Sequence, residues 1–156
     1  MKTKGYKALI AISAFAIFFC LLNTVWTCVL SYNTYTAENN FLTFEKQPLF
    51  IPYAIYFGRL LFIPLYNTLL ITFLVKQLVA IKKGILFPRI NVRIINLIAL
   101  CYFIGDFCAE NTALMFFENN PLLINDSTII YTLLFIIFGI LYKMAVDVAE
   151  ENNLTV

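Results

Sequence analysis

The sequence predicts an all-α integral membrane protein, a four-helix bundle whose amino and carboxyl termini are both cytoplasmic. Of its 156 residues, 62% are hydrophobic and only 13% are charged, whereas soluble domains are about 45–50% apolar and about 25% charged. Four apolar runs each reach the ~20 residues that a helix needs to cross a bilayer. Basic residues gather on alternate connections between these runs. We therefore expect a single membrane domain, residues 1–156.

The first two apolar runs cover about residues 8–30 and 51–80. The first is too long for the apolar part of a signal peptide and is not followed by an A-x-A cleavage site, so we expect an uncleaved helix. The second ends in Lys82 and Lys83, two cations that complement the negative end of the helix dipole. Gly84 then follows as the expected left-handed C-cap.

The third and fourth runs cover about residues 94–117 and 128–146. Asn91, after a short link, is the predicted N-cap of the third helix, and Asp126 or Ser127 that of the fourth. Membrane strands are excluded because they alternate in character over about ten residues, whereas these runs are continuously apolar.

The distribution of Lys and Arg predicts the orientation. The amino terminus holds three of them before the first run, at Lys2, Lys4 and Lys7, and the middle link with its flanks holds five, at Lys76, Lys82, Lys83, Arg89 and Arg93. The loop 31–50 holds only Lys46, and the loop 118–127 holds none. The positive-inside rule therefore places both termini and the middle link in the cytoplasm.

Arg59 lies in the second run, and Asp106 and Glu110 lie in the third, in stretches otherwise apolar enough to cross a membrane. A charge at the bilayer centre costs at least about 2.5–3.5 kcal/mol unless it is paired or hydrated. The helical rise places Arg59 ~10 Å below the outer boundary, and Asp106 and Glu110 ~18 Å and ~24 Å above the inner one. Because residues four apart share a helix face, we predict an ion pair or triad in which the guanidinium binds these carboxylates.

This intramembrane cluster has two interpretations. It is either a buried ion pair that fixes which helices pack together, or a substrate, ion or proton site. On the third helix, Ala99, Tyr102 and Ala109 share the side of Asp106, whereas the larger Leu97, Leu100 and Ile104 lie opposite. Small and polar residues are typical of close helix contacts in membranes. The second and third helices are therefore predicted neighbours.

The cytoplasmic face forms a second group of charges. The basic link is expected to attract anionic headgroups, and the acidic tail to lie against the link or against a partner protein. Charge that only sets the topology is the alternative interpretation. The residues in question are Lys82, Lys83, Arg89, Arg93, Asp147, Glu150 and Glu151.

Missing motifs argue against enzymatic activity. The chain has no His, no phosphate-binding Gly-rich loop and no G-x-S-x-G sequence. Its four cysteines lie in apolar runs without C-x-x-C spacing, which favours packing over metal binding. A net charge of +2 gives no reason to expect direct nucleic-acid binding. We predict no catalytic residue, no metal and no cofactor.

Two short stretches resemble a known family. The link reads Lys83-Gly84-Ile85-Leu86-Phe87-Pro88-Arg89-Ile90-Asn91-Val92-Arg93, and the chain closes with Ala149-Glu150-Glu151-Asn152-Asn153-Leu154-Thr155-Val156. Both are similar to the bacterial membrane family called domain of unknown function 2975, although Pro88 stands where many members carry a polar residue. The resemblance implies a multi-pass protein of the bacterial cytoplasmic (inner) membrane, without an established activity. It also hints at partnership with small helix-turn-helix regulators, and it implies nothing about the intramembrane charges.

These observations support two hypotheses of function. The first is a non-enzymatic accessory or regulatory membrane protein that docks a cytoplasmic regulatory protein on the link 84–93 and the tail 147–156. The second is a small transporter or an ion or proton pathway that uses Arg59, Asp106 and Glu110, as a homo-oligomer because four helices enclose little space. A membrane enzyme is the least favoured reading.

Overall fold

The computed structural model describes residues 3–36, 50–113 and 122–154, and within these ranges every regular element is a helix. The elements are α1 (Thr3–Thr36), α2 (Phe50–Lys82), α3 (Ile90–Ala113) and α4 (Asp126–Leu154). All four helices are long and apolar enough to cross a membrane. The predicted all-α class and the four predicted spans are therefore confirmed.

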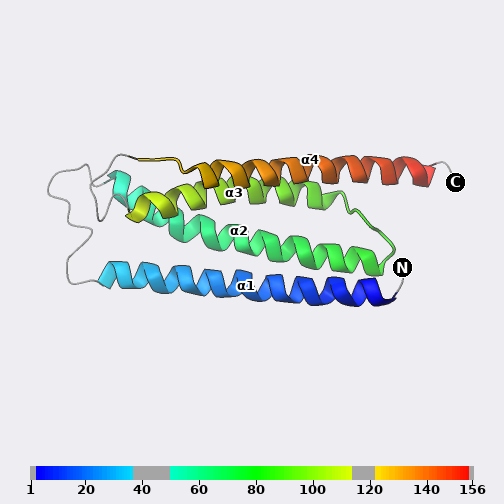
Figure 1. Ribbon diagram of the computed structural model, residues 1–156, viewed down its shortest axis with the longest axis horizontal. Coiled ribbons are helices and arrows are strands. Elements are labelled where there is room, and N and C mark those ends of the chain that lie inside the picture. Colours follow the sequence, from blue (N-terminus) through cyan, green and yellow to red (C-terminus); the bar gives the residue numbers. More distant parts are fainter. Residues whose placement is uncertain (1–2, 37–49, 114–121, 155–156) are drawn as a thin grey trace.

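The four helices run side by side, each antiparallel to the one before it (Figure 1). α1 begins, α4 ends, and the link between α2 and α3 turns at the same end of the molecule. α2 and α3 share the largest contact, which confirms the predicted pair, while α1 packs on α2 and α4 packs on α3. The centre of the fold is thus the α2–α3 pair.

Glycines mark the places where the helices approach one another most closely. A Cβ on Gly58 of α2 would lie 2.6 Å from the Sγ of Cys108 on α3, and one on Gly105 would lie 3.3 Å from the backbone N of Ile63. A Cβ on Gly139 of α4 would lie 2.8 Å from the Oδ1 of Asn96. Small residues at such crossings are how helices pack tightly in lipid.

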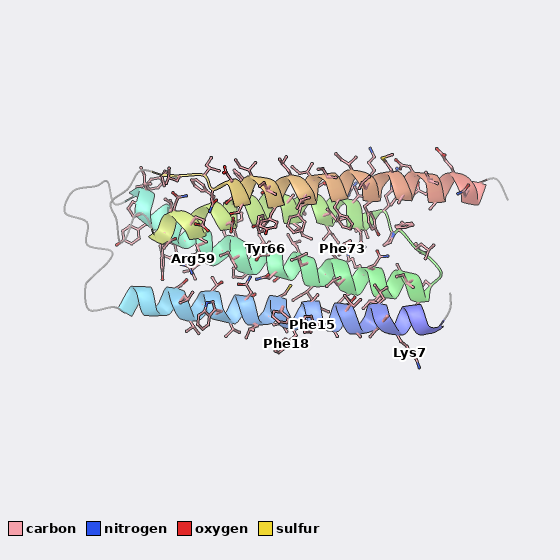
Figure 2. All side chains as sticks on the ribbon, viewed as in Figure 1. Lys7, Phe15, Phe18, Arg59, Tyr66 and Phe73 are labelled. Carbon is pink, nitrogen blue, oxygen red and sulfur yellow. The ribbon has the colours of Figure 1, made fainter. Side chains whose placement is uncertain are left out.

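Large apolar side chains cover the outside of the helices. Phe15 and Phe18 on α1 are 66% and 59% exposed and point away from the other helices (Figure 2). The buried side of α1 instead carries small polar residues, Ser13, Thr27 and Ser31. This arrangement is the reverse of a soluble helix, whose apolar stripe faces the core, and it suits a lipid solvent.

The structure confirms one of the predicted helix caps and contradicts two. Gly84 has φ 81°, and its neighbour Ile85 donates N–H to the carbonyl of Ala80 at 2.9 Å, so the predicted C-cap is confirmed. Asn91 lies inside α3, so its predicted N-cap role is wrong. The N-cap prediction for α4 is also wrong, because Asn125 caps it by accepting the N–H of Ser127 at 3.3 Å on its Oδ1.

Candidate functional site

A cavity of about 340 Å³ lies between α1, α2 and α3, and two opposite charges line it. Arg59 comes from α2 and Asp106 from α3. Figure 2 shows the Arg59 side chain pointing from α2 toward α1. The other lining side chains are mainly polar or aromatic: Asn23, Trp26, Thr27, Tyr66 and Tyr102. The structure thus brings together two of the three predicted intramembrane charges.

Arg59 is partly buried, and its side chain is not neutralised by a carboxylate within the described ranges. Its Nε is buried and has no hydrogen-bond partner there. The ion pairs of the described residues, taken at N–O separations up to 4.0 Å, all involve Arg89. The described ranges therefore do not show the predicted ion pair between Arg59 and the α3 carboxylates.

Asp106 is held by a contact that the sequence did not indicate. Its Oδ2 accepts a hydrogen bond from the Oγ1 of Thr128 on α4 at 2.7 Å, and Thr128 is completely buried. This bond fixes the carboxylate at the contact of α3 with α4. Only a weak signal in the sequence pointed to this partner, because Thr128 is one of several polar residues in the first turn of α4.

Glu110 does not join Arg59 and Asp106. It is exposed and lines a separate hollow of about 410 Å³ with Leu123, Asn125 and Asp126. Residues four apart on a helix are offset by about 40°, and here that offset turns Glu110 toward the segment that precedes α4. Of the three charges predicted to cluster, Arg59 and Asp106 line one cavity and Glu110 lies outside it.

Hydrogen bonds join α1 to α2 at and beside the cavity. The Nδ2 of Asn23 donates to the hydroxyl of Tyr66 at 2.9 Å, and the Nδ2 of Asn67 donates to the Oγ1 of Thr24 at 3.1 Å. The ring of Tyr66 meets that of Tyr102 on α3 edge to face, with centroids 5.6 Å apart. These contacts give the cavity a fixed aromatic and amide lining.

A second polar group lies near the link and is hydrogen-bonded across three helices, although the buried Oδ1 of Asn91 has no partner within the described ranges. Asn91 is completely buried; its Nδ2 donates to the Oε1 of Gln77 at 2.9 Å and to the hydroxyl of Tyr142 at 3.3 Å. Tyr142 in turn donates to Gln77 Oε1 at 2.7 Å. Sequence reasoning missed this network, which joins α2, α3 and α4, because its members are far apart in the chain.

The basic link and the acidic end of α4 lie together. Arg89 is 3.5 Å from the Oε2 of Glu150 and 3.9 Å from the Oδ1 of Asp147. Arg93 lines a hollow of about 320 Å³ beside this contact, together with Arg89, Lys143 and Asp147. The remaining predicted residues of this face, Lys82, Lys83 and Glu151, are exposed.

The described ranges show no metal centre. No group of three or more His, Cys, Asp or Glu side chains there is arranged to hold a metal ion. All four cysteines are free, and Cys101 and Cys108 are buried at helix contacts.

Comparison with known proteins finds no protein-family model, curated protein or solved structure that matches the chain. The resemblance to domain of unknown function 2975 therefore stays a prediction.

Proposed function

We propose that the chain is a non-enzymatic accessory protein of the bacterial cytoplasmic membrane, with its termini and link in the cytoplasm, that docks a soluble regulatory protein. The docking surface would consist of the link 84–93 and the last turns of α4, residues 143–152. The positive-inside count supports the orientation. The resemblance of the link and tail to a bacterial membrane family supports the location.

The observation that carries this proposal is the contact of Arg89 with both Asp147 and Glu150. An ion pair between exposed side chains contributes little stability, typically about 0–1 kcal/mol. Its consequence here is geometric, because it holds the link against α4 and makes one surface from two segments distant in sequence.

Two hollows on this surface suggest what the partner presents. One, lined by Arg93 and Lys143, favours acidic side chains. The other, of about 420 Å³, is lined by Leu86, Phe87, Met144 and Val148 and favours apolar side chains. Three of the four charged residues that line the first hollow are basic, namely Arg89, Arg93 and Lys143 against Asp147. The partner of matching chemistry is a soluble protein with an amphipathic segment that carries acidic and apolar residues.

A photo-crosslinking amino acid placed at Val148 tests this proposal in native membranes. Val148 is exposed in the apolar hollow, and Ile136, exposed near the middle of α4, provides a matched lipid-facing control position. We expect one soluble protein to crosslink at position 148 and not at 136. The purified partner should then bind the purified membrane protein, and the substitutions Arg93→Glu and Lys143→Glu should weaken that binding.

Other results would count against docking. If both positions crosslink only to lipid, the basic hollow is a site for anionic headgroups and the proposal is wrong. If charge reversal at Arg93 and Lys143 leaves binding by the purified partner unchanged, the surface is not the one that recognises it.

A further inference from the structure

We propose that the cavity between α1, α2 and α3 binds a zwitterion that carries a phosphate or carboxylate and a primary ammonium group. The anionic group would contact Arg59 and the ammonium would contact Asp106. This inference goes beyond the docking function and does not depend on it, because the cavity and the docking surface share no lining residue.

The first step of the argument is that the two charges share a cavity but do not pair. Arg59 and Asp106 both line it, yet within the described ranges they form no ion pair up to 4.0 Å, and the Arg59 Nε has no hydrogen-bond partner. Opposite charges in an apolar medium attract strongly. Their separation across one cavity leaves room for a ligand between them.

The second step concerns net charge. A simple anion would compensate Arg59 and leave Asp106 uncompensated, and a simple cation would do the reverse. A charge left unpaired within the membrane costs at least about 2.5 kcal/mol. A zwitterion compensates both groups and adds no net charge, so it is the ligand class that best fits this pair.

The aromatic walls of the cavity, in addition to Asp106, favour the binding of an ammonium group. Tyr66, Tyr102 and Trp26 contribute aromatic rings, whose faces attract cations. The Oδ2 of Asp106 accepts a hydrogen bond from Thr128 at 2.7 Å, and this bond orients the carboxylate. A guanidinium is also the side chain best shaped to hold a phosphate or carboxylate through two parallel hydrogen bonds.

Size and access indicate where the zwitterion comes from. About 340 Å³ is near the lower limit of about 300–1,000 Å³ for small-molecule sites, so the cavity accommodates a headgroup and not a whole lipid. Trp26 on the rim is 61% exposed, and its neighbour Val25 is 60% exposed. A phospholipid with an ethanolamine headgroup can therefore enter sideways, its acyl chains along α1. A free zwitterion such as glycerophosphoethanolamine, which is also a phosphate diester, offers the same chemistry.

The chain provides its own probe of this site, because Trp26 is its single tryptophan and lines the cavity. We would titrate the purified protein with dihexanoyl phosphatidylethanolamine, phosphatidylcholine or phosphatidylglycerol and follow Trp26 fluorescence. We expect a saturable change with phosphatidylethanolamine at about tenfold lower concentration than with the other two. Choline has no N–H to donate to Asp106, and phosphatidylglycerol has no cation.

Four variants separate the site from general lipid effects. Arg59→Gln and Asp106→Asn should each weaken the response to phosphatidylethanolamine by about tenfold, while Arg93→Gln and Asp126→Asn, outside the cavity, should retain it. Circular dichroism reports whether each variant is folded. If Arg59→Gln does not fold, Arg59→Lys keeps the cation but not the paired hydrogen bonds, and should bind with intermediate strength.

Free glycerophosphoethanolamine distinguishes the two sources. A saturable response to it identifies a soluble zwitterion as the ligand, whereas a response to the lipid alone identifies the headgroup; both results support the site. Equal responses to all three lipids, or a wild-type response from Arg59→Gln and Asp106→Asn, would overturn it. Crosslinking at position 148 measures the docking surface separately, so failure of one proposal leaves the other intact.

Discussion

Two polar regions within the apolar helices differ in how their hydrogen bonds are arranged. Near the link, Gln77, Asn91 and Tyr142 bond to one another across three helices, and Asn91 and Tyr142 are buried. Between α1 and α3, Arg59 and Asp106 face a cavity without pairing within the described ranges. The first region stabilises the packing of the helices, whereas the second keeps charge available to a ligand. In the sequence, the charged residues stand out within the apolar runs, whereas the neutral polar residues do not.

The largest loss of stability should come from Asn91→Leu. The substitution removes two hydrogen bonds in a completely buried position, and we expect it to lower the free energy of unfolding by about 2 kcal/mol. Thermal unfolding in detergent, with reversibility checked by rescanning, measures this. Asn23→Leu is the matched control, because Asn23 is exposed and makes one such bond to Tyr66. An equal loss for both variants would remove the distinction between the regions.

A smaller loss should come from Thr128→Val, which deletes the hydroxyl that donates to Asp106 and nearly preserves the shape. Hydrogen bonds to charged groups contribute more than neutral ones, so we expect a loss of about 1.5 kcal/mol. Thr132→Val is the control, because the Thr132 hydroxyl donates only to the Thr128 carbonyl of its own helix in the described structure. If Thr128→Val has no effect, α4 does not hold the carboxylate.

The smallest effect should come from Arg89→Gln. Arg89 is exposed and its two partners are half exposed, so solvent and salt screen the ion pairs. We expect a loss below about 0.5 kcal/mol in low salt and none in high salt. Unfolding curves at two ionic strengths test this, with Lys83→Gln as the control. A large loss that salt does not reduce would show that Arg89 is part of the core.

The sequence was sufficient to predict the helices but less reliable about their ends. Predicted spans of 8–30 and 128–146 correspond to Thr3–Thr36 and Asp126–Leu154, because apolar character marks only the part that crosses the bilayer, whereas backbone hydrogen bonding continues beyond it. Gly84 was predictable because its conformation depends on local residues. Asn91 was not, because its partners lie 14 and 51 positions away.

The sequence was sufficient to predict the membrane depth of the charged residues in the candidate site, but not which side chains they contact. Helical rise placed Arg59 and Asp106 at similar levels, and they do line one cavity. The same arithmetic grouped Glu110 with them, but depth does not specify the direction of a side chain. Ile104 shows the same limit: assigned to the lipid side, it packs against Ile55, Tyr56 and Cys108.

The most direct test of the central claim is a double-mutant cycle on Arg59→Gln and Asp106→Asn, measured by unfolding with and without phosphatidylethanolamine. Our account predicts that the coupling free energy is larger by about 1 kcal/mol or more with phosphatidylethanolamine than with phosphatidylcholine alone, because the ligand connects the two charges. A coupling of the same size under both conditions would contradict the account and show that Arg59 and Asp106 pair directly as a structural element.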